Sequence, residues 1–384
     1  MRAQNHSTGR FYRPELDVVR FLAFFCVFLH HVVPDDGDPH VVKLLGHYAP
    51  ILFASREAFR FGLNLFFTLS AFLICELLLR ERQATGAVAV KEFYIRRILR
   101  IWPLYYLGLA LGALVAYLPG GFHTDMAEIG WFSIFMSPWC LAHQGWHGNP
   151  VFPMWSISVE EQFYVFSPWI VKYLNRKMLY GFCALLILVA NAWLYWLTST
   201  GHTSHQSTFN SLVQFECFAA GILLCLALKG QTPRMASWQR PILLVCAWLC
   251  WFLATYPMQT RFDTNRNPGF WPLMSGYALA SLGSVLILIA FLGMDSKWLP
   301  GWAIYLGRIS FGLYVYHEFV IYAMHRLLVG RLAPLGSILP VKFALDLGTT
   351  ILVAALSYRY FETPFLKMKK RHSVIESQPI SGTR

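Results

Sequence analysis

Apolar stretches of roughly twenty residues recur along almost the whole chain and are separated by short polar segments. A stretch of about 20 apolar residues is long enough to cross a lipid bilayer as a helix. The pattern predicts ten such spans, at about residues 16–33, 61–79, 101–118, 154–171, 178–198, 209–228, 241–257, 270–292, 302–325 and 341–361. We therefore predict an all-α, polytopic integral membrane protein with about ten transmembrane helices.

Two further segments have a different pattern. Residues 41–59 are amphipathic, which indicates a helix lying at the membrane surface. Residues 129–141 are apolar, but the segment is short and contains Pro138. We expect a single re-entrant or interfacial helix there, because the segment is too short to span the bilayer.

The composition agrees with a membrane protein. Of the 384 residues, 56% are hydrophobic and only 14% are charged, whereas about a quarter of a typical soluble domain is charged. No long window is free of apolar spans. We expect one membrane domain over residues 1–371, followed by a polar and disordered tail over residues 372–384.

The net charge of +12 invites a nucleic-acid interpretation, but the basic residues lie at the ends of the spans. In that position they set the orientation of a membrane protein, because cytoplasmic loops are enriched in Lys and Arg. Placing both termini in the cytoplasm puts the dense basic segment at 80–100 inside, while residues 119–153, which have no Lys or Arg, lie outside. This distribution predicts an inner (cytoplasmic) membrane protein whose partner is the lipid bilayer and not a nucleic acid.

Metal and disulfide chemistry are poorly supported by the sequence. The eight cysteines form no Cys-x-x-Cys pair, and most fall inside apolar spans. His143 and His147 are four residues apart, but no third ligand is apparent. We expect no metal.

The first span carries two polar side chains, Arg20 and His31, which are eleven residues apart. At about 100° per residue, eleven steps return almost to the same side of a helix, so both lie on one face. Such a face must meet protein, water or a ligand, because exposure to lipid costs several kcal/mol. Alternatively, each side chain extends to its nearer membrane interface.

The fourth span opens with Trp155 and contains the adjacent carboxylates Glu160 and Glu161. Ser158 followed three residues later by Glu161 fits a capping box at a helix N-terminus. That role would leave Glu160 free to orient a histidine or to hold a substrate hydroxyl.

Arg97 and Arg100 are three residues apart and share a helix face at the start of the third span. They are either an ordinary positive flank of a span or a clamp for phosphate, which arginine binds in a bidentate manner. His317 lies in a later apolar stretch, where a hydrogen bond between helices is the simpler explanation.

Six motifs together resemble the acyltransferase-3 family of integral-membrane acyltransferases, which O-acylate carbohydrates in bacteria. Ala71 departs from this pattern, because the family usually has glycine there. The matching segments, in the family's order, are Arg20 with His31, residues 62–74, Arg97 with Arg100, residues 155–164, residues 314–317 and residues 361–364.

The resemblance implies an O-acyltransferase that takes an acyl group from cytoplasmic acyl-CoA, most often acetyl-CoA, and transfers it to a carbohydrate hydroxyl. It implies that Arg97 and Arg100 bind the donor, that His31 and Glu160 are catalytic, and that Arg20, Trp155 and His317 contact substrate. A histidine suits a general base or an acyl carrier, because its pKa lies near neutrality.

Two other classes of function also fit a polytopic protein. A transporter or flippase of a glycan or a lipid-linked substrate would have many spans and a polar stripe, although the sequence has no related halves. A membrane sensor of acidity could use the outer histidines, but it would leave the paired arginines unexplained.

Overall fold

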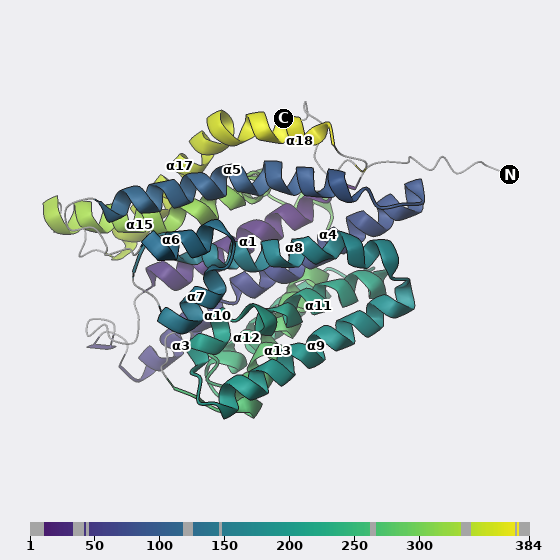
Figure 1. The fold of residues 1–384 in the computed structure, drawn as a ribbon. Coiled ribbons are helices and arrows are strands. Elements are labelled where there is room, and N and C mark those ends of the chain that lie inside the picture. The colour runs from purple at the N-terminus through teal and green to yellow at the C-terminus, as the bar shows by residue number, and fades with distance from the viewer. Residues whose placement is uncertain are drawn as a thin grey trace.

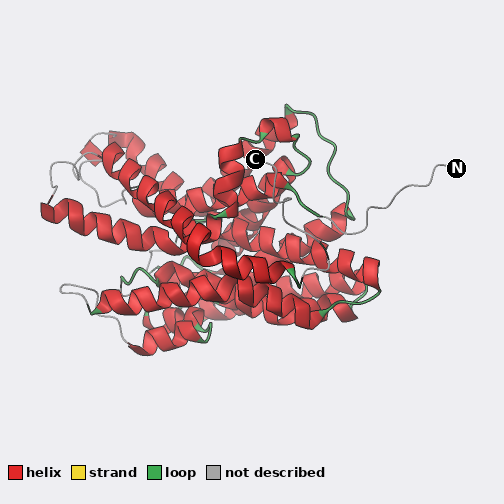
Figure 2. Cartoon of the chain, turned by 90° about the horizontal axis from the view of Figure 1, so that it is seen from above, coloured by secondary structure: helices red, strands yellow, loops and turns green. Residues whose placement is uncertain are grey.

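A computed structural model describes residues 11–33, 42–43, 46–117, 126–145, 148–261, 266–331, 339–372 and 375. These residues form helices and no strand, which confirms the predicted all-α class. The long helices run side by side in one bundle (Figure 1), and the view from above shows short loops joining them (Figure 2).

In the described ranges, all elements are helices. In order they are α1 (Pro14–Val32), η1 (Gly46–Tyr48), α3 (Ala49–Phe59), α4 (Gly62–Thr85), α5 (Val90–Ala116), α6 (Met126–Ser133), α7 (Ser137–Gln144), η2 (Phe152–Met154), α8 (Trp155–Tyr173), α9 (Arg176–Ser199), α10 (Ser204–Phe209), α11 (Ser211–Leu228), α12 (Gln239–Thr255), α13 (Phe270–Phe291), η3 (Ser296–Trp298), α14 (Gly301–Arg308), α15 (Ser310–Arg331), α17 (Leu339–Ser357), the π-helical η4 (Tyr358–Glu362) and α18 (Thr363–Lys370).

Six helical segments of the described chain are long and apolar enough to cross a membrane, which makes this a multi-pass membrane protein. They are Gly46–Thr85, Val90–Ala116, Arg176–Ser199, Ser211–Leu228, Phe270–Phe291 and Pro340–Lys370. Helices α1 and α8, also predicted as spans, each carry three charged side chains within nineteen residues. Three of these charged residues, Asp17, Arg20 and Glu160, line the site described below. The full set of ten spans stays a prediction.

Helix α1 lies inside the bundle and packs against α3, α4, α13, α14 and α15. Two glycines bring its neighbours unusually close. A side chain at Gly62 of α4 would overlap the backbone of Ala23, and one at Gly307 of α14 would overlap the backbone of Asp17. These approaches place the polar face of α1 against the other helices that form the site.

The family's usual glycine is replaced by Ala71, and the structure accommodates it. Ala71 is fully buried in α4 and faces Gly221 of α11. A Cβ atom added at Gly221 would come within 2.9 Å of the Ala71 Cβ. Gly221 thus leaves room for the Ala71 methyl group, and α4 and α11 pack closely.

Two predicted helices are broken in the structure. The expected single helix at 129–141 is wrong: α6 and α7 are separated at Phe135, which has a φ of 59°. Pro138 lies in the first turn of α7, where its missing N–H leaves no helical hydrogen bond unmade. The expected span at 302–325 is divided at Ile309 into α14 and α15, and the last span continues through η4 into α18.

Candidate active site

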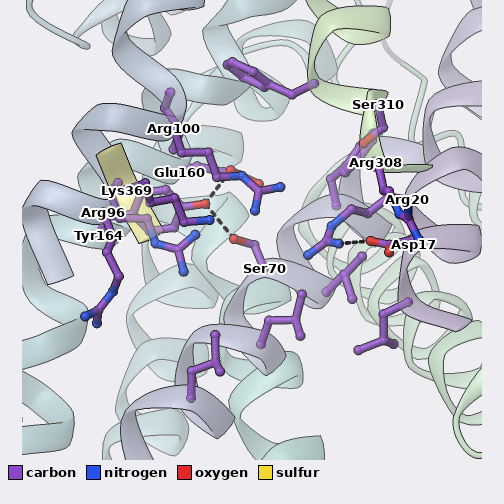
Figure 3. Close-up of a pocket in the computed structure, with 18 of the residues that line it drawn as sticks. Asp17, Arg20, Ser70, Arg96, Arg100, Glu160, Tyr164, Arg308, Ser310 and Lys369 are labelled. Atoms are coloured by element: carbon purple, nitrogen blue, oxygen red, sulfur yellow. Dashed lines mark hydrogen bonds and ion pairs between the residues drawn. The ribbon is translucent and has the colours of Figure 1, made fainter. Parts of the chain in front are cut away.

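A cavity of about 450 Å³ lies between α1, α4, α5, α8 and the C-terminal helix α18. We call it the cationic cavity, because eight basic and four acidic side chains of the described residues line it. Figure 3 shows Arg100, Arg96 and Lys369 on one side of it, opposite Arg20 and Arg308. The basic residues are Arg13, Arg20, Arg96, Arg97, Arg100, Arg308, Lys369 and Lys370, and the acidic residues are Asp17, Glu81, Glu160 and Glu362.

Arg97 and Arg100 both line this cavity, as a phosphate clamp would require. The Arg97 guanidinium lies over the rings of Phe93 and Tyr164, at 5.4 and 5.2 Å from their centroids. Arg100 forms no hydrogen bond or ion pair with any residue that the structure describes. The neighbouring Arg96 is different, because it pairs with Glu81 at 3.1 Å and donates to the carbonyl of His372.

Arg20 also lines the cationic cavity, where the Asp17 carboxylate lies 2.5 Å from its guanidinium. Asp17 accepts a second hydrogen bond from the Tyr12 hydroxyl at 3.0 Å. Asp17 therefore fixes the direction of Arg20, one turn further along the same helix. The structure thus places Arg20 with Arg97 and Arg100, which come from a different helix.

Glu160 lies in the cationic cavity and not beside His31. Its carboxylate accepts a hydrogen bond of 2.6 Å from Tyr164, whose hydroxyl lies 2.7 Å from the Ser70 hydroxyl (Figure 3). The structure does not bring Glu160 to His31, so the predicted pairing of these two residues is not observed.

The predicted capping box at Ser158 and Glu161 is wrong. Helix α8 begins three residues earlier, at Trp155, so Ser158 lies inside the helix. Ser158 bonds to Ser137 at 2.8 Å instead, and Glu161 accepts a hydrogen bond of 3.1 Å from Trp102. The short 3₁₀ turn over Phe152–Met154 leads directly into α8 and starts the helix early.

His31 pairs with Glu318 of α15, at 2.7 Å between Nδ1 and the carboxylate. In the neutral imidazole, an Nδ1–H group that donates to Glu318 leaves the lone pair on Nε2. The ring of His317 lies 5.2 Å from that of His31, and its Nδ1 bonds to the carbonyl of Tyr314 at 2.6 Å. His317 is fully buried.

A second, smaller cavity of about 50 Å³ lies beside His31, and we call it the histidine pocket. Trp155 lines it and packs edge-on against Phe209, at 5.0 Å between ring centroids. Its polar lining combines a cation, amides and hydroxyls that can hold a hydroxylated ligand. These residues are Arg60, Asn64, Thr208, Gln214 and Tyr277.

The chain matches the family model described as "Acyltransferase domain" over residues 13–359, which include both cavities' principal side chains. It belongs to the acyltransferase-3 family. The resemblance drawn from the six motifs is thereby confirmed.

Named relatives of this acyltransferase-3 protein extend the comparison. It is 25% identical over 93% of its length to "Putative O-acetyltransferase SAS0844" of Staphylococcus aureus, of which it covers 58%. It is 22% identical over 94% of its length to "Peptidoglycan O-acetyltransferase OatA" of Listeria monocytogenes, of which it covers 56%. It is also 22% identical to "Nodulation protein 10" of Rhizobium leguminosarum, with 96% of each chain covered. No solved structure matches the chain.

The acyltransferase-3 chain thus spans less than two thirds of the length of the staphylococcal and listerial relatives.

One group in the acyltransferase-3 site could ligate a metal ion. His31, His317 and Glu318 offer ligand atoms within 4.8 Å of one another, and two histidines with a glutamate are a known zinc set. The same atoms also make a direct hydrogen bond between His31 and Glu318. The expectation that no metal takes part stays a prediction.

Asp17, Ser70, Glu318 and Glu362 are not among the predicted site residues, although Ser70 and Glu362 lie inside the motif segments 62–74 and 361–364. Glu318 had a usable signal, because a carboxylate in an apolar helix is costly and usually has a partner or a function. Glu362 lies at the end of a π-helical turn, and such turns are frequent at functional sites. The partners of Asp17 and Ser70 become visible only in the folded chain.

Proposed function

We propose that this acyltransferase-3 protein is a membrane O-acetyltransferase that moves an acetyl group from acetyl-CoA to a hydroxyl of an exported or cell-surface carbohydrate. One observation carries the proposal: the cationic cavity and the histidine pocket share two lining residues, Leu63 and Tyr314. A charged donor and a neutral acceptor can therefore bind in adjoining but different chambers.

The cationic cavity suits the donor. Coenzyme A carries a diphosphate and a 3′-phosphate, and the cavity has eight basic side chains against four acidic ones. Arg97 and Arg100 would hold phosphate, since neither forms an ion pair with a described residue, and the Arg97 guanidinium lies over aromatic rings. Arg20, held by Asp17, would guide the pantetheine arm toward the histidine pocket.

The histidine pocket suits the acceptor. Trp155 offers an apolar ring face, while Asn64, Thr208 and Gln214 offer donors and acceptors for sugar hydroxyls. The listerial relative is named for O-acetylation of peptidoglycan, which makes a bacterial glycan the acceptor class that we propose here. Trp155 would contact the acceptor. His317 is fully buried beside His31 and lines neither cavity, so its predicted substrate contact would need a movement of the pocket wall.

The chemical step uses His31 as general base. The Nε2 lone pair takes the proton of the acceptor hydroxyl while the hydroxyl oxygen attacks the thioester carbonyl carbon. The new oxygen–carbon bond forms, the carbon–sulfur bond breaks, and the proton passes from His31 to the leaving CoA thiolate. Glu318 holds the Nδ1–H and stabilises the imidazolium that forms between these events.

The orientation follows from the donor. Acyl-CoA is a cytoplasmic metabolite class, and the basic residues concentrate on the side predicted to face the cytoplasm. We propose that the cationic cavity opens to the cytoplasm and that the protein lies in the inner (cytoplasmic) membrane. Transfer would then bring an acetyl group from one compartment to a glycan in the other.

The test uses purified protein in detergent with acetyl-CoA and a panel of acceptors. The panel contains peptidoglycan fragments, lipopolysaccharide oligosaccharides and exopolysaccharide oligosaccharides. We expect release of the CoA thiol that depends on one acceptor, together with a mass increase of one acetyl group on that acceptor. Movement of a glycan across proteoliposomes without thiol release would instead identify a transporter.

A further inference from the structure

The cationic cavity and the histidine pocket are adjacent and share part of their lining. Within the described part of the chain, Leu63 of α4 and Tyr314 of α15 are the residues that line both. His31 lines only the histidine pocket, and Arg20 lines only the cationic cavity. A thioester bound by the arginines would reach His31 by the most direct route if it passed between Leu63 and Tyr314.

Tyr314 is held firmly in this passage. Its hydroxyl donates to the carbonyl of Pro153 at 2.6 Å and lies 2.7 Å from the Ser156 hydroxyl. Only 6% of the residue is exposed, and the ring of Phe66 packs edge-on against it at 5.9 Å. The ring cannot turn aside without breaking two buried hydrogen bonds.

Leu63 is held by its neighbour in sequence. The preceding residue, Gly62, sits directly against the backbone of Ala23 in α1. The first turn of α4 is thus packed closely on α1, because an added Cβ at Gly62 would overlap the Ala23 carbonyl oxygen. The next residue, Leu63, lines both cavities. In closely packed surroundings, even one added methylene group is not accommodated without cost.

The two chambers differ strongly in size. The cationic cavity measures about 450 Å³ and the histidine pocket about 50 Å³. The acceptor must share the histidine pocket with the part of the acyl group that passes between Leu63 and Tyr314. A longer acyl chain would compete with the acceptor for that space.

We propose that Leu63 and Tyr314 form an acyl-length filter that admits an acetyl group to His31 and excludes longer acyl chains. The proposal rests on the proposed function, since it assumes that acyl-CoA binds in the cationic cavity. In this proposal, Leu63 and Tyr314 determine that the donor is a short-chain acyl-CoA.

The test compares acetyl-CoA, butyryl-CoA and hexanoyl-CoA as donors, with whichever glycan of the panel accepts acetyl, and measures thiol release. We expect the wild-type protein to prefer acetyl-CoA. Leu63→Ala should raise the rate with butyryl-CoA relative to acetyl-CoA by about tenfold or more, because one methylene in a pocket changes discrimination by about 10- to 200-fold. Leu63→Val should produce a smaller shift in the same direction.

The matched control is Leu73→Ala. Leu73 lies on the same helix and lines the cationic cavity but not the histidine pocket. Its loss should leave the ratio of butyryl to acetyl transfer unchanged. Because the expected result is a gain with the longer donor, unfolding of a variant cannot imitate it.

Three outcomes overturn the filter: equal wild-type rates for all three donors, an unchanged ratio in both Leu63 variants, or the same shift in Leu73→Ala. Absence of acetyl transfer by the wild-type protein to every glycan in the panel would instead contradict the proposed function, and the filter with it. Failure of the proposed function is therefore seen in acetyl transfer, and failure of the acyl-length filter is seen in the ratio of butyryl to acetyl transfer.

Discussion

The imidazole of His31 on α1 lies 2.7 Å from the carboxylate of Glu318 on α15. This contact joins the first helix of the chain to one near its end, and it fixes which ring nitrogen of His31 is left to accept a proton. His31 lines the histidine pocket, and 23% of its side chain and 19% of that of Glu318 are exposed. The pair is therefore both oriented and accessible.

The first prediction concerns Glu318. Glu318→Gln keeps the shape but removes the charge that holds the Nδ1–H tautomer and stabilises the imidazolium. We expect kcat to fall by about a hundredfold or more with little change in the KM for acetyl-CoA. Steady-state kinetics of the purified variant measure both. Glu318→Asp should recover part of the rate, and a Glu318→Gln variant as fast as wild type would show that the contact has no catalytic value.

The second prediction concerns the donor clamp. Arg97→Ala or Arg100→Ala should weaken CoA binding by about tenfold or more, since a hydrogen bond to a charged group contributes about 1.5–3 kcal/mol. Lysine at either position should restore little of the affinity for CoA, because it lacks the planar guanidinium that binds phosphate in a bidentate manner. Isothermal titration with CoA provides the measurement.

Arg359→Ala is the matched control for the clamp, because Arg359 is exposed and lies over Tyr360 instead of lining the cavity. Its affinity for CoA should equal that of the wild type. If the Arg97→Ala and Arg100→Ala variants bound CoA as tightly as the wild type, the two arginines would be an ordinary positive flank of a span and not a clamp.

The third prediction concerns orientation. Thr200 and Gln231 are exposed residues in the loops on either side of α11 and its short preceding helix. With the native cysteines replaced, Thr200→Cys should react with an impermeant maleimide only from outside the cell. Gln231→Cys should react only after the membrane is opened. The reverse labelling would put the cationic cavity on the outer side, away from cytoplasmic acyl-CoA.

The fourth prediction concerns packing around α1. Gly307→Ala places a methyl group against the backbone of Asp17, so it should lower the free energy of unfolding by about 1–3 kcal/mol. It should also disturb Arg20, which Asp17 orients. Thermal unfolding in detergent, alongside CoA titration, reports both effects.

Gly181→Ala is its control, because Gly181 lies within α9 with no atom within 4 Å of an added Cβ. Alanine there should be neutral or stabilising by up to about 1 kcal/mol. A Gly307→Ala variant as stable as Gly181→Ala would mean that α1 and α14 can separate without cost.

The all-α fold and much of the site could be predicted from local pattern. The eleven-residue spacing of Arg20 and His31 and the three-residue spacing of Arg97 and Arg100 are properties of single helices, and helix periodicity makes them readable. A run of about twenty apolar residues likewise predicts a helix from the local sequence alone. These features needed no knowledge of how the helices pack.

The partners of these residues could not be predicted in the same way. Glu160 and Glu318 are both carboxylates in apolar helices, and nothing in either local sequence says which one meets His31. That depends on which face of α8 or α15 turns toward α1, and the glycine contacts at Gly62 and Gly307 help decide it. The break at Ile309 likewise depends on α14 packing against α1.

The central claim, that His31 is the catalytic base, is tested most directly against its neighbour. His30 also borders the histidine pocket, but its Nδ1 lies 3.2 Å from the carbonyl of Arg56, where it ties α1 to α3. Adjacent helical residues point about 100° apart, and only His31 meets Glu318. His30→Ala should therefore act mainly on stability.

The measurement is acetyl transfer by His31→Ala and His30→Ala, compared at equal expression and with melting temperatures recorded. His31→Ala should lose about a hundredfold to ten-thousandfold in turnover while remaining folded. If His31 carries the acyl group itself, the loss should be larger, and the wild-type protein should accumulate an acyl-histidine when the acceptor is poor. His30→Ala should lose far less. Near-normal turnover in His31→Ala, or an equal loss in both variants, would contradict the assignment of His31 as the base.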